Sequence, residues 1–317
     1  MTTAAPDDAP IARRLTVCFR GVTWALGLCT LAGFLGAYGW WLDLFDHFRV
    51  HGMVSGLLLG SVAFVSHRRH IALAALTLAL INGLAMSRTH PGAARSGGVP
   101  ILDALVFNVH SIGDPEAVSR LLDNEQSTAV VGLLEVTPDW VERLETALTP
   151  WPYRVVVPRH DNFGLLLASR WPLSRSSRAT NVGGVPIIDA TVTPPNAAPV
   201  DFLLVHPPPP MSARATAIRN ESVRAYAKQR RRHRDGILAG DFNATLWSRA
   251  LAPLATAGYG SVRRDWGTVA TWPTAYGPLG IAIDHAFVRG DLTAIDFEVL
   301  GDAGSDHRPI RFTVGRP

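Results

Sequence analysis

The sequence predicts a mixed α/β (α+β) domain that is preceded by three transmembrane helices. Near the amino terminus, residues 21–42 carry no charge, residues 50–66 have His51 as their single ionisable residue, and residues 71–87 have none. Downstream, short apolar runs typical of strands alternate with helical patterns, which predicts sheets covered by helices. With 317 residues, 47% of them hydrophobic, the chain fits one domain of about 200 residues plus a membrane unit.

The three apolar segments are long enough to cross a bilayer, which takes about 20 apolar residues and about 17 at the least. A cleaved signal peptide would need one such segment rather than three. Three buried helices of a soluble domain are the alternative. Basic residues precede the first segment and fill the turn at residues 67–70, so the positive-inside rule predicts that residues 1–20 are cytoplasmic and that everything after residue 87 is extracytoplasmic.

The basic character of the chain is confined to this amino-terminal part. The net charge is +4, but the part after Pro100 has 22 basic and 22 acidic residues. The high isoelectric point therefore does not indicate a polyanionic partner. Cys18 and Cys29 lie in or beside the first apolar segment, about 16 Å apart along a helix, so the downstream domain has neither a disulfide nor thiol chemistry.

Residues 88–99 are rich in Gly, Ala, Pro and Ser, which predicts a short linker to a domain that covers residues 100–317. Strands are predicted at residues 101–109, 129–134, 154–157, 163–168, 187–192, 202–205, 237–239, 281–288 and 311–314. Helices are predicted at residues 117–122, 138–148, 213–232 and 248–257.

Polar side chains stand directly after most of the predicted strands, where sheet proteins build their sites. In chain order they are Asn108, Glu135, His206, Asp241 with Asn243, Asp284, and Asp306 with His307. A single Glu or His after a strand is usually a solvated or hydrogen-bonded structural residue. Six such endings in one domain are harder to explain in this way, so we expect them to form one site. His110, Asp189 and His285 are also near these motifs and are expected to be structural.

The most specific patterns are Gly-Asp-Phe-Asn at residues 240–243 and Ser-Asp-His at residues 305–307. Over residues 102–317 the chain resembles the endonuclease/exonuclease/phosphatase superfamily. The residues that carry the resemblance are Asn108, Glu135, His206, residues 240–243, Asp284 and residues 305–307. The resemblance implies a DNase I-like four-layer αββα sandwich and a metal-dependent phosphoric-ester hydrolase.

Hydrolysis of a phosphate ester needs a cation on the phosphate oxygens, an activated water and a partner for the developing charge. Carried over position by position, the resemblance implies that Glu135 binds the metal with help from Asn108 and Asp306. Hard oxygen ligands favour Mg²⁺ or Mn²⁺ over Zn²⁺, because no Cys and no close pair of His accompanies them.

The resemblance also implies roles for five other residues. Asp241 would orient or deprotonate the attacking water, and Asn243 would fix that geometry beside the substrate. His206 and His307 would donate hydrogen bonds to the non-bridging phosphate oxygens. Asp284 would hold His307 in its useful tautomer.

The plan of short spans followed by a compact outer domain is similar to that of the teicoplanin-resistance membrane protein VanJ, a bacterial member of the family. This similarity implies the bacterial cytoplasmic membrane and a lipid-linked pyrophosphate. A site tethered by about a dozen residues reaches only substrates at or near the membrane. We therefore expect dephosphorylation of a lipid similar to undecaprenyl pyrophosphate, with a phospholipid or sphingomyelin phosphodiesterase as the first alternative.

Three other readings fit less well. A compact domain without net charge offers little of the counterion release on which DNA-cleaving enzymes depend, so nucleic acid is the weaker substrate. An inactive membrane binding protein would usually have lost Glu135, Asp241 or His307, and all three are present. A transporter is not favoured, because the predicted spans contain no ionisable residue except His51.

Overall fold

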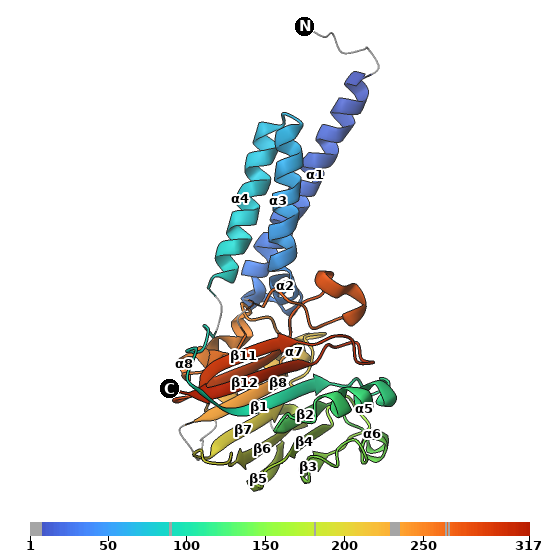
Figure 1. The fold of residues 1–317 in the computed structure, drawn as a ribbon. Coiled ribbons are helices and arrows are strands. Elements are labelled where there is room, and N and C mark those ends of the chain that lie inside the picture. The colour runs from blue at the N-terminus through green and yellow to red at the C-terminus, as the bar shows by residue number, and fades with distance from the viewer. Residues whose placement is uncertain (1–7, 89–90, 181, 229–234, 264, 266) are drawn as a thin grey trace. The chain divides into compact units, whose positions relative to one another are not determined.

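The computed structural model describes residues 8–88, 91–180, 182–228, 235–263, 265 and 267–317 (Figure 1). The chain divides into a helical unit, Met1–Thr89, and a catalytic unit, His90–Pro317. The first seven residues of the predicted cytoplasmic segment, and residues 229–232 of a predicted helix, lie outside the described residues.

Four α-helices make up the described part of the helical unit. They are α1 (Asp8–Phe34), α2 (Trp40–Asp46), α3 (Arg49–Val65) and α4 (Arg69–Met86), with the short 3-10 helix η1 (Gly36–Tyr38) between α1 and α2. By length and composition α1 and α4 could each cross a membrane, and α2 with α3, bent by 58°, could form a third span. The unit therefore has two or three helices of transmembrane type.

The first helix differs from the predicted segment 21–42, because it begins earlier and ends at Phe34. Gly36 begins η1 and Gly39 follows it, and glycine is among the poorest residues for continuing a helix. A Cβ on Gly36 would stand 2.9 Å from Asp43 Cα, so the backbone of α2 approaches the break closely. Residues 35–42, predicted as the end of the first span, therefore contain η1 and the start of α2.

The helices extend beyond the predicted spans, and α3 begins with a buried ionisable residue, Arg49, that lies just outside the predicted span 50–66. Arg49 is 1% exposed and donates hydrogen bonds to Asp46 Oδ1 at 2.9 Å, Thr30 O at 3.0 Å and Asn82 Oδ1 at 3.3 Å. Its guanidinium also lies 4.1 Å from the centre of the Phe34 ring. The contacts join α1, α2, α3 and α4, and buried charges in proteins persist when they are paired in this way. Asp46 and Arg49 both lie between the predicted spans 21–42 and 50–66.

Two six-stranded sheets form the centre of the catalytic unit. One sheet has the order β11 (Thr293–Val299), β12 (Ile310–Arg316), β1 (Val99–Asn108), β2 (Val130–Leu134), β4 (Leu165–Ser169), β3 (Tyr153–Val157). The other has the order β5 (Leu173–Thr180), β6 (Pro186–Val192), β7 (Val200–Val205), β8 (Gly236–Asp241), β10 (Asp284–Arg289), β9 (Gly260–Ser261). Each sheet contains one parallel pair, β1 with β2 and β7 with β8.

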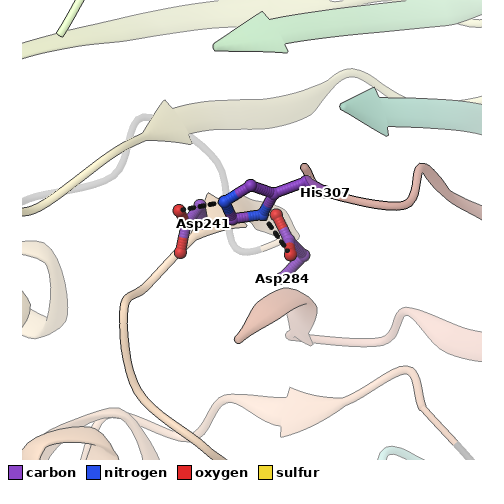
Figure 2. Close-up of side chains that lie close together, drawn as sticks. All are labelled: Asp241, Asp284 and His307. Carbon is purple, nitrogen blue, oxygen red and sulfur yellow. Dashed lines mark hydrogen bonds and ion pairs between the residues drawn. The ribbon is translucent and has the colours of Figure 1, made fainter. Parts of the chain in front are cut away.

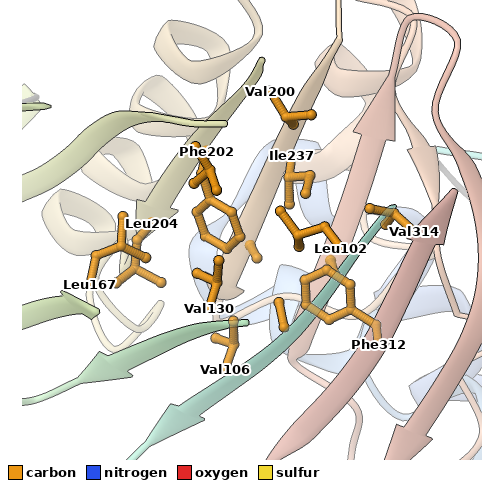
Figure 3. Close-up of a cluster of buried hydrophobic side chains, with 14 of the residues drawn as sticks. Leu102, Val106, Val130, Leu167, Val200, Phe202, Leu204, Ile237, Phe312 and Val314 are labelled. Carbon is orange, nitrogen blue, oxygen red and sulfur yellow. The ribbon is translucent and has the colours of Figure 1, made fainter. Parts of the chain in front are cut away.

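The main hydrophobic core lies between the two sheets, as Figure 3 shows for side chains such as Val106, Phe202 and Phe312. A second core, which includes Phe107, Leu122 and Trp140, fills the space between the first sheet and the helices α5 (Pro115–Asn124) and α6 (Pro138–Arg143). The parallel pair β7 and β8 is joined through α7 (Ala213–Lys228), which packs with α8 (Ala252–Thr256). The inner face of this sheet packs against the other sheet, so α7, which joins β7 to β8, covers the outer face. The expected four-layer sandwich is confirmed.

Every predicted strand corresponds to a strand of these sheets, but β5, β9 and β11 were not predicted. The sequence of β5, Leu-Ser-Arg-Ser-Ser-Arg-Ala-Thr, has little apolar character, and β9 has only two residues. All three lie at the edge of a sheet, where one neighbour is enough to hold a strand whose own pattern is weak. The segment predicted as a helix at residues 248–257 divides into the 3-10 helix η3 (Arg249–Leu251) and α8.

Much of the predicted linker is bound to the catalytic unit. Ala94 N donates to Ser261 O, and Ser261 N donates to Gly92 O, both at 2.7 Å. Ala294 N donates to Arg95 O at 2.7 Å, so this segment extends β9 and β11. Residues 92–97 therefore do not form a free tether, since their backbone groups are satisfied by neighbouring strands.

Candidate active site

The site lies where strands of both sheets end. Asn108 is the last residue of β1, and Glu135 follows β2 directly, so the parallel pairing brings them together. In the other sheet, His206 follows β7 directly and Asp241 is the last residue of β8, so these two also lie together at the ends of a parallel pair. Asp284 begins β10, which runs antiparallel to β8, and is paired in register with Asp241. The packing of the two sheets thus collects residues that are far apart in the chain.

Asp241 is the centre of this cluster. Its Oδ2 lies 3.3 Å from His206 Nε2, 3.6 Å from His307 Nε2 and 3.3 Å from Asn108 Nδ2. Asp241 and Asn108 are each 1% exposed. Because Asn108 belongs to one sheet and Asp241 to the other, their hydrogen bond joins the two sheets at the floor of the site.

His307 is held between two carboxylates (Figure 2). Its Nδ1 lies 2.9 Å from Asp284 Oδ2, while its Nε2 faces Asp241. The backbone around Asp284 is fixed as well, because Thr271 Oγ1 accepts a hydrogen bond from Asp284 N at 3.2 Å and Arg263 donates one to Asp284 O at 3.0 Å. Asp284 therefore sets the orientation of the imidazole.

Glu135 is 7% exposed and accepts hydrogen bonds on both oxygens. Asn108 Nδ2 donates to Oε1 at 3.0 Å, and Ser111 N donates to Oε2 at 3.2 Å. Asn108 is itself oriented by His110 N, which donates to its Oδ1 at 3.0 Å. Asn108 thus presents its amide NH₂ to Glu135 and Asp241 and holds these carboxylates close together.

Asn243 is positioned by hydrogen bonds of both its backbone and its side chain. Asn243 N donates to Asp241 Oδ1 at 2.8 Å, and Nδ2 donates to Pro207 O at 3.0 Å. The same Nδ2 lies 3.5 Å from His206 Nε2. Asn243 is half-buried at the rim of the cluster, where an amide can contact a substrate.

The backbone adopts left-handed conformations at this site. Glu135 has φ 61°, Asn243 has φ 49° and His110 has φ 57°, values that residues other than glycine rarely adopt. Gly240 has φ 150°, and a Cβ there would stand 1.9 Å from Val205 O, so only glycine fits before Asp241. Strain of this kind is typical of functional sites, where surrounding structure holds it in place.

The buried groups also shift one another's protonation. Burial acts to lower the pKa of His307, but the charges of Asp284 and Asp241 outweigh it and raise the pKa to about 10. Burial opposes the protonated form of His206 as well, yet its hydrogen bond to Asp241 raises the pKa. Burial alone would raise the pKa of Asp241, but His307 and His206 lower it. At neutral pH an ionised Asp241 therefore faces a protonated His307, and the pKa of His206 on its other side is raised.

The donor set fits a hard divalent cation. Within the described part of the chain, no arginine or lysine forms an ion pair with Glu135, and the charge of this carboxylate raises the pKa of His206 instead. Asp306 stands beside the cluster, where Oδ2 accepts from Trp272 Nε1 at 3.0 Å and Oδ1 lies 3.5 Å from His110 Nδ1. Buried carboxylates without a counter-ion are costly, and a metal ion would neutralise them.

A second group of candidate ligands is formed by Asp241, Asp284 and His307, whose ligand atoms lie within 4.8 Å of one another. In this group the hydrogen bond between His307 and Asp284 already satisfies one atom of each residue. An ion there would lie beside a hydrogen bond that is already formed, whereas Glu135 has no ion pair with an arginine or lysine in the described chain. Glu135 is therefore the first candidate for a metal ligand.

Several supporting residues had not been assigned from the sequence. Arg263, 2% exposed, and Thr271, fully buried, hold the backbone at Asp284, and Ser305 Oγ donates to Asn108 O at 2.7 Å. These residues act through backbone contacts, which leave no local sequence signal beyond their nearness to the motifs. His285 is structural, because burial lowers its pKa to about 3 and its Nε2 donates to Ala244 O at 2.8 Å.

Comparison with known proteins agrees with this geometry. The chain matches the model of the Endonuclease/Exonuclease/phosphatase family over residues 105–307, which covers every residue of the cluster. The chain belongs to this family. Its members are metal-dependent phosphoester hydrolases, and the protein is therefore an enzyme of this class. None of the curated proteins matches the chain.

Solved structures of family members share the fold. A family member from Beutenbergia cavernae has a TM-score of 0.56 at 16% identity, over 69% of this chain and 72% of its own. TDP2 from D. rerio, solved with a single-stranded DNA product, has a TM-score of 0.56 at 18% identity, over 68% of this chain and 98% of its own. A mannosyl-6-phosphatase from Bacteroides thetaiotaomicron has a TM-score of 0.54 at 14% identity, over 67% and 99%. At these identities the likeness establishes the fold of the catalytic unit.

The contact between Asp284 and His307 leads to a first prediction. Asp284→Asn should lower kcat/KM for bis(4-nitrophenyl) phosphate by about 10- to 100-fold, because His307 loses the partner that orients it. The pKa of His307, about 10 in the wild type, should fall, so the alkaline limb of the pH–rate profile should move to lower pH. Asp296→Asn, at an exposed strand position, is the control. An unchanged alkaline limb in Asp284→Asn would contradict this role.

The raised pKa of His307 also affects the stability of the metal-free protein. Because the pKa of His307 is raised on folding, its contribution is complete below about pH 6.5 and is lost as the pH rises. Thermal unfolding of the chelated wild type should therefore show a loss of stability toward pH 10 that is smaller in Asp284→Asn.

Metal binding by Glu135 is a second prediction. Glu135→Gln keeps the size of the side chain but removes its charge, so Mg²⁺ or Mn²⁺ binding measured by calorimetry should weaken by at least about tenfold. Glu142→Gln, at an exposed position of α6, should bind the metal as the wild type does. If Asp284→Asn abolished binding while Glu135→Gln preserved it, the ion would belong to the Asp241, Asp284 and His307 group instead.

Proposed function

We propose that this enzyme hydrolyses a phosphorylated lipid at a membrane surface, with a lipid pyrophosphate similar to undecaprenyl pyrophosphate as its substrate. The observation that carries the proposal is the covalent connection between two or three helices of transmembrane type and a phosphoester hydrolase. Residues 87–91 lie between the end of α4 at Met86 and the first bonded linker residue, Gly92. Five extended residues reach about 18 Å at most, so a membrane around the helices would be close to the catalytic unit.

The rim of the site supports a lipid substrate. Ile112 (83% exposed), Met211 (72%), Leu279 (70%) and Tyr276 (66%) are among the most exposed large apolar side chains of the described catalytic unit. All four lie on loops at the strand ends that form the site: Ile112 follows β1, Met211 follows β7, and the other two are in the 3-10 helix η4 (Thr274–Leu279) before β10. Exposed apolar side chains gathered in one region are typical of a surface that meets a membrane or an apolar ligand.

These loops are tied to the site itself. Ser111 N, beside Ile112, donates to Glu135, and Pro207 O, in the loop of Met211, accepts from Asn243. Thr274 N, at the start of η4, donates to Asp306 O at 2.8 Å. Contact of the rim with lipid would therefore bring a headgroup phosphate to the buried cluster rather than to a distant face.

The proposed roles follow from the geometry described above. Glu135 would hold Mg²⁺ or Mn²⁺, which neutralises charge on the phosphate oxygens, while Asn108 positions Glu135, and Asp306 offers a further oxygen ligand nearby. His307, which is protonated at neutral pH, and His206, whose pKa is raised, would bind the non-bridging oxygens. Asp241 has a lowered pKa and is a weak base, so it would orient the attacking water more than deprotonate it.

Asn243 would contact the substrate from the rim. The mannosyl-6-phosphatase among the similar structures shows that the fold serves a phosphatase, and TDP2 shows it with a DNA product. The neutral charge after Pro100 favours the first kind of substrate here, because DNA binding gains most of its affinity from basic side chains.

For the location we propose the bacterial cytoplasmic membrane, with the amino terminus in the cytoplasm and the catalytic unit outside. The support is the distribution of basic residues, because Arg13, Arg14 and Arg20 lie in the first half of α1 and Arg68 and Arg69 lie at the turn from α3 to α4. Lipid membrane and phosphorylated lipid are thus the proposed partners. A fusion reporter placed after Pro317 and active in the cytoplasm would overturn this orientation.

The substrate is tested by phosphate release from undecaprenyl pyrophosphate, with full-length protein in detergent and Mg²⁺ or Mn²⁺. Release should disappear with chelator and fall by at least about a thousandfold in Glu135→Ala and His307→Ala, because each removes a group that acts on the phosphoryl charge. Sphingomyelin and a glycerophospholipid serve as diester substrates. Cleavage of only the diesters would make the enzyme a lipid phosphodiesterase, and cleavage of only DNA a nuclease.

The rim is tested with the double variant Ile112→Ser and Met211→Ser. Its activity on the lipid substrate in vesicles should fall by about tenfold or more, because two apolar contacts with lipid are lost. Its activity on soluble bis(4-nitrophenyl) phosphate should stay unchanged. Val99→Ser is the matched control, since Val99 is 68% exposed at the start of β1, about 30 Å from the site end of that strand. An equal loss on both substrates would contradict the proposed role of the rim.

A further inference from the structure

A groove of about 710 Å³ lies in the helical unit, between α1 and the first half of α4. One end is lined by basic side chains, among them Arg20 of α1 and Arg69 of α4. The other end is lined by apolar side chains, among them Trp24 of α1 and Leu78 of α4. Its volume is in the range of sites that hold small molecules and parts of lipids. No residue of the catalytic cluster takes part in it.

Three arginines line the basic end, of which Arg68 is bound to other side chains while Arg20 and Arg69 are exposed. Arg68 Nε donates to Thr16 Oγ1 at 3.1 Å, and its guanidinium lies 5.2 Å from the centre of the Phe19 ring, so it links the α3–α4 turn to α1. Arg20 and Arg69 are exposed, and within the described residues neither has an acidic partner. Two positive charges from different helices therefore converge on the mouth of the groove without a counter-ion.

The apolar end is closed by the two helices. Arg20, Trp24 and Gly27 are spaced by four and three residues, so they share one face of α1. A Cβ on Gly27 would stand 3.8 Å from Leu78 Cδ1, which shows that the helices meet at this level. From Arg20 to Gly27 the groove extends about 10 Å along the helix, enough for a headgroup region and the upper part of an acyl chain.

We propose that this groove binds an anionic phospholipid, with its phosphate between Arg20 and Arg69 and an acyl chain against Trp24 and Leu78. The argument is charge complementarity combined with the apolar end. A lipid with a net negative charge matches the two unpaired arginines, whereas a zwitterionic lipid brings its own cation to the same place. Inorganic phosphate would leave the apolar end uncovered. The site needs the helices to lie in a membrane, but it is independent of the catalytic reaction.

The test is a lipid titration of the thermal unfolding midpoint of the full-length protein in a neutral detergent. Phosphatidylglycerol should raise the midpoint saturably, while phosphatidylcholine and inorganic phosphate should not. The double variant Arg20→Gln and Arg69→Gln should weaken the apparent affinity for phosphatidylglycerol by about 30-fold, as expected for the loss of two basic contacts. Its midpoint without lipid should stay close to that of the wild type, because both side chains are exposed.

The matched control is Arg88→Gln with Arg120→Gln, which makes the same change in net charge at exposed positions outside the groove. This control should keep the affinity of the wild type. Equal stabilisation by phosphatidylcholine, stabilisation by inorganic phosphate alone, an unchanged affinity in the groove variant or an equal loss in the control would each overturn the proposal. None of these readouts depends on phosphoesterase activity, so they remain informative whichever phosphoester the enzyme cleaves.

Discussion

The fold and the site both depend on the pairing of one buried carboxylate, that of Asp241. A buried carboxylate is unfavourable unless it is paired, and Asp241 finds its partners in three other segments: Asn108 of the facing sheet, His206 of its own sheet and His307 of a carboxy-terminal loop. Each partner is in turn held by others, His307 by Asp284 and Asn108 by His110 N. The two sheets can therefore pack fully at this end only when the site is assembled.

This dependence explains the chemistry of the cluster. His307 and His206 lower the pKa of Asp241, and the protonated His307 places a positive charge beside this carboxylate. Glu135, which no arginine or lysine neutralises in the described chain, leaves a place for a metal cation beside them. The carboxylates of Asp284 and Asp241 thus hold the positive charge of His307 in position, and Glu135 and Asn243 adopt left-handed backbone conformations in the same cluster.

The helical unit shows how far local patterns can mislead. The apolar stretches identified the helices, but Asp46 and Arg49 lie between two of these stretches, where no local pattern shows a partner for them. In the structure they pair with each other, and Arg49 reaches Thr30 and Asn82 on other helices. Only the packing of four helices could show that these charges have buried partners. The same holds for residues 92–97, whose composition predicts a linker but whose backbone is bound by β9 and β11.

By itself, the sequence determined the apolar helices, most of the strands and the order of polar residues at the strand ends, because these depend on local periodicity and on short motifs such as residues 240–243. It could not show which atoms meet. The tertiary structure decided that Asn108 orients two carboxylates, that Asp306 stands with Trp272 and His110, and that Arg263 and Thr271 support Asp284. The physical reason is that hydrogen bonds and burial between distant segments are set by the packing of the two sheets, which no local pattern records.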